Sequence, residues 1–448
     1  STIEKHDMTQ GKILLPLVSF TIPLVLGNLF QLTYNAADSV IVGKYVGEQA
    51  LAAVGTSTPI MNIAILLISG MCMGASVLMS SQYGAKDYDT LSRQISTTML
   101  AGCGFSVVFS LLMLLLANPV LRLIRVPETA IPEAAAYLRI IFMGLIFTFM
   151  YNFLANTMRA LGDSKTPLYF LVTSAFLNIF GDLFFVVVLR WGVAGSAIAT
   201  VFSEGLCCLL CGIYIKKKIP LLCLGKKWWV FDKSLLGKTV SYGSTSAMQQ
   251  VCLQLGKLII QSVVNTQGVA VMAAFTAVNR VDDFAYTPQQ NIGHAMTTFL
   301  AQNKGAGHKE RMKKGFQTGL LIELVYSIGL FCVIWGLAPQ IMTLFAEDGD
   351  AQVVSLGISY LHLISWMYIL PGLTNGVQGF FRGIGDLKVT LYSTFMNMFG
   401  RVVAVFVMIR LLQMEFASLA WANMVGWIVM LLFEVPLLVK SMRNGECG

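Results

Sequence analysis

Long stretches of apolar residues, separated by short polar ones, run through the whole sequence. A bilayer core about 30 Å thick needs roughly 20 apolar helical residues to cross it, and about twelve stretches meet this requirement. They cover residues 13–42, 50–81, 91–117, 131–159, 164–189, 193–216, 234–263, 269–301, 312–336, 351–380, 387–411 and 415–440. Their apolar residues are continuous rather than alternating, which favours helices over the strands of a closed barrel. The pattern predicts an all-α polytopic membrane protein with twelve transmembrane helices.

Composition agrees with this prediction and excludes several other classes of protein. Of the 448 residues only 12% are charged, whereas soluble domains carry about 25%. The net charge of +8 does not indicate a nucleic-acid partner, because the basic residues lie in short clusters between apolar stretches, as in membrane proteins. The chain contains no nucleophile–base pair, no set of metal ligands and no phosphate-binding GxxxxGK motif, so we expect neither an enzyme nor an ATP-driven pump.

The basic residues also predict the orientation of the chain. One set of loops, including residues 216–238 and 304–314, holds about 22 Lys and Arg residues, and the opposite set holds about five. Because basic loops remain inside the cell, we expect a multi-pass protein of the cell (inner or plasma) membrane with both termini cytoplasmic.

The second half of the sequence repeats the first. Residues 159–169 (RALGDSKTPLY) correspond to residues 382–392 (RGIGDLKVTLY), and NIFGD at 178–182 corresponds to NMFGR at 397–401. We expect an N-lobe of six helices at 1–217, a cytoplasmic linker at 218–238 and a C-lobe of six helices at 239–448. Parallel repeats of this kind are related by an axis along the membrane normal and are common in transporters. In each junction we expect Asp163 or Asp386 to cap the following helix.

Ionisable residues at membrane depth are energetically costly and are therefore candidates for function. Asn178 and Asp182 are four residues apart and share one helix face. Thr200 lies at a matching depth on the next predicted helix, and Asp38 joins from the first. Two carboxylates, an amide and a hydroxyl form an oxygen-only pocket that suits a hard cation such as Na⁺ or a shared proton. Alternatively, the two acids pair with Arg139 or with helix backbone.

Pro23 lies fifteen residues before Asp38 on the first predicted helix. A proline inside a helix removes a backbone hydrogen bond and leaves a point of bending. We expect Pro23 to act as a hinge that responds to protonation or ion binding at Asp38, with a purely structural kink as the alternative.

The second half has its own ionisable residues at membrane depth, but their signs are mixed. Arg280, Asp283, Gln249 and Arg401 are candidates for a substrate site or a second polar site. Because Arg280 and Asp283 are three residues apart, they could neutralise each other. The local alignment of NIFGD with NMFGR places Arg401 opposite Asp182, so the second half has no acid at that position.

These features resemble the MATE (multidrug and toxic compound extrusion) transporters over essentially the whole chain, and most of all their DinF-like branch with its MepA-type exporters. The resemblance rests on the two six-helix halves, the GD-x-K junctions, Pro23 and Asp38, and the motifs QYGA at 82–85 and NIGHAMTTF at 291–299. It implies two pseudo-twofold-related bundles with a cation-coupling site at Asp38, Asn178, Asp182 and Thr200. The NorM-like branch instead uses acids on helices seven and ten, where this chain offers Gln249, Gln250, Asn375 and Gln378.

The resemblance further implies an antiporter that exports cationic amphipathic compounds by alternating access. Abundant Met and aromatic residues suit such substrates through adaptable packing and cation–π contacts. We expect a functional monomer without a cofactor, coupled to H⁺ or Na⁺, and the carboxylates of Asp38 and Asp182 suit either ion. The alternative function is a flippase for lipid-linked or other amphiphilic substrates.

Overall fold

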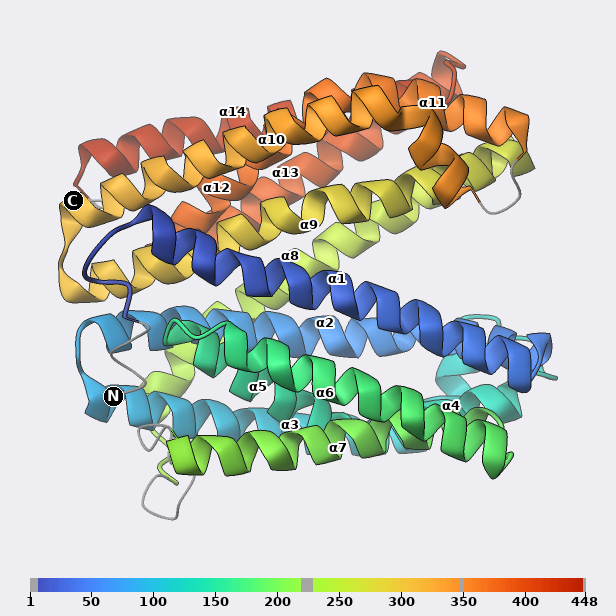
Figure 1. Cartoon of the computed structure of the whole chain (residues 1–448), viewed down its shortest axis with the longest axis horizontal. Helices are drawn as coiled ribbons and strands as arrows, with labels where there is room; N and C mark the ends of the chain where they lie inside the picture. Colours follow the sequence, from blue (N-terminus) through green and yellow to red (C-terminus); the bar gives the residue numbers. More distant parts are fainter. Residues whose placement is uncertain (1–6, 219–228, 347–349, 446–448) are drawn as a thin grey trace. The chain divides into compact units, whose positions relative to one another are not determined.

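Every regular element that the structure describes is helical. The computed structural model describes residues 7–218, 229–346 and 350–445 (Figure 1). Its elements are α1 (Leu14–Tyr45), α2 (Glu48–Gly84), α3 (Tyr88–Leu123), α4 (Ile131–Met143), α5 (Leu145–Ala160), α6 (Lys165–Asp182), η2 (Leu183–Val188), α7 (Val193–Lys218), α8 (Lys233–Val264), η5 (Asn265–Gln267), α9 (Val269–Ala306), α10 (Lys309–Phe345), α11 (Ala351–Ser365), η6 (Trp366–Tyr368), α12 (Ile369–Gly383), α13 (Leu387–Val405), η7 (Phe406–Leu411) and α14 (Ser418–Arg443). The predicted all-α class is confirmed.

Up to ten of the twelve predicted membrane spans coincide with described helices that are long and apolar enough to cross a bilayer. Within the described ranges nine segments are long and apolar enough to cross a bilayer, and one of them consists of α11, η6 and α12. Helices α4 and α5 form a tenth span that is bent by 46°. The remaining two, α8 and α9, have 32 and 38 residues. They are long enough to cross a bilayer but are not among the segments apolar enough to do so, so these two spans stay predictions.

The chain folds into two compact units whose boundary falls inside helices. The first unit contains residues 26–247, and the second contains residues 8–25 together with 248–448. Helices α1 and α8 therefore each contribute to both units, unlike the predicted division into 1–217 and 239–448. Of the predicted linker 218–238, residues 219–228 lie outside the described residues, and Lys233–Lys238 already belong to α8.

Backbone conformation repeats between the two halves. Gly162 and Gly385 have φ angles of 91° and 88°, and each occupies the tight turn between two helices, a conformation that glycine adopts without strain. The carboxylate of Asp163 accepts hydrogen bonds from the backbone N–H (3.1 Å) and hydroxyl (2.7 Å) of Thr166. This confirms the predicted cap on α6. Asp386 occupies the same place at the N-terminus of α13, but its side chain makes no capping hydrogen bond there.

The π-helices η2 and η7 correct the predicted register within this repeat. Both have six residues and begin 223 positions apart, directly after Asp182 and Val405. The structural counterpart of Asp182 is therefore Val405, and the counterpart of Asn178 is Arg401. The prediction that paired Asp182 with Arg401 is wrong by four residues. A shift of about one helical turn keeps the same face buried, so two similar short motifs can be matched one turn out of register.

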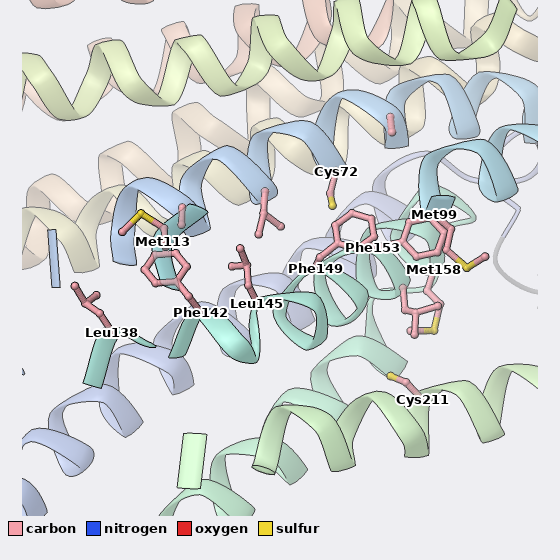
Figure 2. Packing of buried hydrophobic residues seen from close by; sticks show 14 of the residues in the cluster. Cys72, Met99, Met113, Leu138, Phe142, Leu145, Phe149, Phe153, Met158 and Cys211 are labelled. Atoms are coloured by element: carbon pink, nitrogen blue, oxygen red, sulfur yellow. The ribbon is translucent and has the colours of Figure 1, made fainter. Parts of the chain in front are cut away.

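Aromatic and sulfur-containing side chains fill the core of the first unit (Figure 2). The rings of Phe149 and Phe153 on α5 stack with centroids 5.8 Å apart, and Cys72 of α2 points toward them. Both rings are at most 2% exposed. This packed layer holds α5 against α2 and α3. Because the layer is apolar, the polar side chains of the first unit lie on other faces of its helices.

Helices α2 and α8 cross with almost no side chain between them. A Cβ atom added at Gly70 would lie 2.6 Å from the Cα of Ala247, and one added at Gly74 would lie 2.5 Å from the carbonyl of Tyr242. Gly70 and Gly74 form a GxxxG pattern, which lets two membrane helices approach backbone to backbone. The first part of α8 is held in the first unit by this contact.

A short segment before α1 is bound by side chains of the second unit. This N-terminal strap, residues 8–12, directs its carbonyl oxygens at Arg311 of α10, whose guanidinium donates to Met8 (2.8 Å), Gln10 (3.1 Å) and Gly11 (2.6 Å). Asn303 of α9 also donates to the carbonyl of Met8 at 3.2 Å. The beginning of α1 is thereby tied to α9 and α10.

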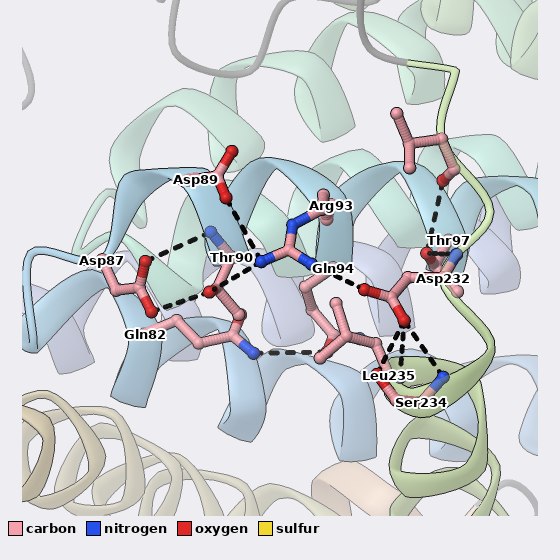
Figure 3. A network of polar contacts seen from close by, with 11 residues as sticks. Gln82, Asp87, Asp89, Thr90, Arg93, Gln94, Thr97, Asp232, Ser234 and Leu235 are labelled. Carbon is pink, nitrogen blue, oxygen red and sulfur yellow. Dashed lines mark hydrogen bonds and ion pairs between the residues drawn. The ribbon is translucent and has the colours of Figure 1, made fainter.

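A second strap, residues 230–234, precedes α8 and is bound by α3 of the first unit (Figure 3). The hydroxyl of Ser96 accepts from the N–H of Val230 (2.8 Å), and Thr97 accepts from that of Asp232 (3.0 Å). Arg93 forms an ion pair with Asp232 at 2.8 Å. Hydrogen bonds from Ser234 hold the pKa of Asp232 below its ordinary value. The two straps are alike in position: each precedes the helix that passes from one unit to the other.

We expect Arg311→Ala to release the N-terminal strap. The guanidinium makes several charge-assisted bonds to backbone carbonyls, and such bonds contribute about 1.5–3 kcal/mol each. The variant should show a lower thermal midpoint and faster proteolytic cleavage within residues 8–12. Lys313→Ala removes the same charge from an exposed position on α10 and should leave both measurements unchanged. Equal cleavage of the two variants would contradict a holding role for Arg311.

Candidate functional site

The structure brings the four predicted site residues together in the first unit. Asn178 and Asp182 lie on α6, and the Asn178 amide donates to the hydroxyl of Thr200 on α7 at 3.4 Å. Asp182 is 0% exposed and Asn178 is 4% exposed. The carboxyl group of Asp38 on α1 is close enough to Asp182 to interact with it electrostatically. The four residues come from three helices, and we refer to them below as the acidic cluster.

The acidic cluster contains several buried acceptor atoms without a donor. Among the described residues, no hydrogen-bond partner is found for Asp38 Oδ1, for either carboxylate oxygen of Asp182 or for Asn178 Oδ1. Two ionised carboxylates have no proton to share, so their proximity does not satisfy either of them. A buried acceptor without a partner costs about 1–3 kcal/mol. A proton shared by the two acids, or a cation bound among the oxygen atoms, would satisfy these acceptors.

The donor set fits a hard monovalent cation rather than a transition metal. All the free acceptors are oxygen atoms, which hard cations prefer. In the part of the chain that the structure describes, no group of three or more His, Cys, Asp or Glu residues is placed to hold a metal ion.

The alternative pairing with Arg139 is not formed. Its Nε atom donates to the carbonyl oxygen of Leu114 at 3.4 Å, and the ion pairs among the described residues include none between Arg139 and either acid. Glu204 of α7 has its own donor, the hydroxyl of Thr148 at 2.7 Å. Neither Asp38 nor Asp182 is therefore paired with Arg139, and the two acids interact with each other.

The π-helix η2 begins directly after Asp182, and π-turns often mark functional sites. Here the second unit has the same π-turn after Val405, where no acid is present. The π-turn therefore belongs to the repeated fold, and the special chemistry of the first unit comes from its side chains.

Pro23 is buried within α1, three residues before Leu26, where the helix passes into the first unit. A turn later, Gly27 packs against Leu168 and Leu171 of α6, the helix that carries Asp182. The proline thus occupies a weakened point of α1, between the tethered beginning of the helix and the part that carries Asp38.

The candidates from the second half lie on α8, α9 and α13. Gln249 of α8 is buried and donates to the hydroxyl of Thr394 at 3.0 Å. Arg280 and Asp283 are exposed on α9, and Asp283 interacts electrostatically with Lys257 of α8. The guanidinium of Arg401 lies over the ring of Trp427, 5.3 Å from its centroid.

The sequence did not single out a buried network around Asp282 of α9. Its two carboxylate oxygens accept hydrogen bonds from the hydroxyls of Tyr368 (2.6 Å) and Tyr360 (3.0 Å). Asn423 of α14 donates in turn to the hydroxyl of Tyr360 at 2.9 Å. The repeat contained one signal for this network, because Tyr360 corresponds to Tyr137 and Asn423 to Thr200 at a spacing of 223.

Comparison with known proteins identifies the family. The family model described as MatE matches residues 23–184 and again residues 246–408, once in each half. The chain is 32% identical to the probable multidrug resistance protein YpnP of Bacillus subtilis, over 87% of this chain and 86% of that protein. It is 29% identical to the probable multidrug resistance protein YoeA of the same organism, over 85% and 82% of the two chains.

Solved structures agree on the fold. The outward-facing conformation of a multidrug resistance MATE family transporter of the MOP superfamily superimposes with a TM-score of 0.89 at 22% identity, covering 98% of each chain. The two model matches begin 223 residues apart, the same spacing as the π-helices. The duplication is therefore a property of the family fold.

Proposed function

Since the chain belongs to the MatE family, whose members are membrane transporters and not enzymes, we propose that it is a cation-coupled multidrug exporter. It exchanges cationic amphipathic compounds for H⁺ or Na⁺, which bind at Asp38, Asn178, Asp182 and Thr200. The observation that carries this proposal is the set of buried carboxylate and amide oxygens without donors among the described residues.

Coupling follows from the energetics of the acidic cluster. Two carboxylates at membrane depth repel each other when both are ionised, and the same pair attracts a cation strongly because the surroundings are of low polarity. Binding of H⁺ or Na⁺ removes this repulsion and draws α1 and α6 together, and release restores it. A ligand that binds one conformation more tightly shifts the balance between the conformations.

Pro23 supplies the conformational link in this proposal. Its missing N–H leaves the carbonyl of residue 19 without a helical partner, so α1 bends there at low cost. Because Asp38 lies beyond this point on the same helix, an ion bound at Asp38 changes the forces on the bend.

Relatives named as multidrug resistance proteins support small amphipathic cations as the substrates. The distribution of Lys and Arg supports a plasma-membrane protein with cytoplasmic termini. We further propose that the monomer is the functional form, since each of the two units has its own core.

Reconstitution tests the function and the coupling ion together. Purified protein in liposomes is given a fluorescent cationic dye, and a pH gradient or a Na⁺ gradient is imposed separately. We expect one of the gradients, or both, to drive dye movement against its concentration difference. Dye movement that is independent of both gradients would contradict antiport. Movement of labelled lipids in place of dye would favour the flippase.

We expect Pro23→Ala to restore the helical hydrogen bond, to straighten α1 and to slow transport severalfold while the protein stays folded. Dye transport in liposomes and the thermal midpoint are the measurements. Pro59→Ala makes the same change inside α2, which lies wholly within the first unit, and should transport normally. Normal transport by the Pro23 variant would exclude the hinge but leave the acidic cluster as the coupling site.

A further inference from the structure

The second unit contains a charged group at the position where the first unit holds a ligand of the acidic cluster. Residues 183–188 and 406–411 fix the correspondence of α6 with α13 at 223 positions. Buried residues agree, since Asp182 and Val186 correspond to the buried Val405 and Ile409. Asn178 therefore corresponds to Arg401.

The same spacing relates α7 to α14. The buried positions Ser203, Cys207 and Cys211 on α7 correspond to Gly426, Met430 and Glu434 on α14, all of them buried. Thr200 thus corresponds to Asn423. The three site positions on α6 and α7 become arginine, valine and asparagine in the second unit, and none of them is an acid.

An acid is nevertheless present nearby, supplied by a different helix. Asp282 of α9 is 5% exposed, and Asn423 reaches it through Tyr360. Tyr286, one turn further along α9, packs edge-on against both Tyr368 and Trp427, with ring centroids 5.6 and 6.0 Å apart. One continuous network therefore joins Asp282 to the residues around Arg401.

Arg401 completes this network, and the ion pairs of the described residues do not include it. Its guanidinium lies over Trp427 and is close enough to Asp282, Tyr286 and Tyr360 to interact with them electrostatically. Its Nε atom has no acceptor among the described residues. The other charges that face this region are Lys257 of α8 and Asp283 of α9.

The two units thus differ in how they satisfy a buried acid. In the described part of the first unit, the carboxylate oxygens of Asp182 lack donors and no fixed positive charge pairs with them. In the second, each carboxylate oxygen of Asp282 has a donor, and a covalently attached cation lies at the position of a site ligand. A fixed cation is always present, whereas an exchangeable one depends on the solution.

We propose that Arg401 acts as a tethered cation, which takes the place of an exchangeable ion in the second unit and restricts ion coupling to the acidic cluster of the first. This role rests on the proposed function of that cluster. Arg401 is a residue that determines coupling specificity and does not contact the substrate in this role. Its removal takes one positive charge away from the buried Asp282 and leaves Lys257 of α8 as its remaining cationic neighbour among the described residues, so a solution cation or proton can neutralise more of the negative charge.

The test measures thermal unfolding in the Asp182→Asn background, so that the first unit no longer responds to ions. Purified protein is heated in Na⁺ or in choline, at pH 8 and at pH 6. The single variant sets the baseline, because other titratable groups of the chain still respond to pH. A remaining dependence on Na⁺ in this variant would count against the acidic cluster, not against Arg401. After Arg401→Ala is added, we expect Na⁺ or acid to raise the midpoint by about 3 °C or more.

Four further variants make the outcome decisive. Arg401→Lys should remove the new ion dependence, because the lysine restores a tethered charge. Asp282→Asn combined with Arg401→Ala should also remove it and should unfold at a higher temperature than Arg401→Ala alone. Arg410→Ala removes an exposed arginine from η7 and should create no ion dependence. Arg401→Gln, which keeps more of the side chain, is measured alongside in case the alanine variant does not fold.

The proposal is overturned if folded Arg401→Ala or Arg401→Gln responds to Na⁺ and pH no more than its parent does. It is equally overturned if the new response persists when Asp282 is replaced by asparagine.

Discussion

Asp182→Asn is expected to abolish gradient-driven export while the protein remains folded. Asp182 supplies two of the four acceptor atoms in the acidic cluster that have no donor among the described residues, and asparagine replaces one oxygen with an N–H donor that repels a cation. We expect transport to fall by about tenfold or more, which corresponds to at least about 1.4 kcal/mol. Dye export from liposomes under the gradient that drives the unchanged protein is the measurement.

Glu204→Gln provides a matched control for this substitution. Glu204 is an acid of the same unit, but its carboxylate already has a donor in Thr148. The control should export dye at a rate close to that of the unchanged protein. Full export by Asp182→Asn would show that the coupling site has been assigned wrongly, and loss in both variants would show a general need for buried acids.

Gly74→Ala is expected to cause a large loss of stability. The added methyl group would lie 2.5 Å from the backbone carbonyl of Tyr242, and a helix backbone cannot move aside as a flexible side chain does. Overpacking costs about 1–3 kcal/mol when side chains can adjust, so we expect a larger loss at this backbone contact. The thermal midpoint of the purified protein measures it.

Gly104→Ala separates this steric effect from the general effect of glycine. Gly104 lies inside α3, and a Cβ atom there would have no neighbour within 4 Å. Alanine favours helix more than glycine does by about 1 kcal/mol, so this control should be neutral or slightly stabilising. Similar midpoints for the two variants would mean that α2 and α8 do not pack backbone to backbone.

Much of this fold could be predicted from local patterns. The length of the apolar stretches predicted up to ten spans that the described helices can form, and for α8 and α9 it predicted the helices themselves. The spacing of Asn178 and Asp182 placed both on one face of α6, since helical geometry depends on sequence separation alone. Thr200 and Asp38 could be added because helices in a bilayer have predictable depth.

The predictions that were less accurate depended on contacts between distant residues. The match of NIFGD with NMFGR was one turn out of register, and the π-helices after Asp182 and Val405 revealed the shift. The division of the chain into 1–217 and 239–448 stays a prediction. The assignment of each half of α1 and α8 to a compact unit depends on which neighbours that half meets. Tyr360 and Tyr368 gave no local sign that their hydroxyls converge on Asp282.

The sequence by itself therefore determined the spans, their duplication and the residues of the acidic cluster, because hydrophobicity, periodicity and helical spacing are local properties of the chain. Only the tertiary structure decided that four oxygen atoms of that cluster lack donors among the described residues and that both oxygens of Asp282 have them. It also decided that Arg401, and not an acid, stands at the position of Asn178 in the second unit. Hydrogen-bond satisfaction depends on side chains that come from several helices, and their meeting is fixed by packing.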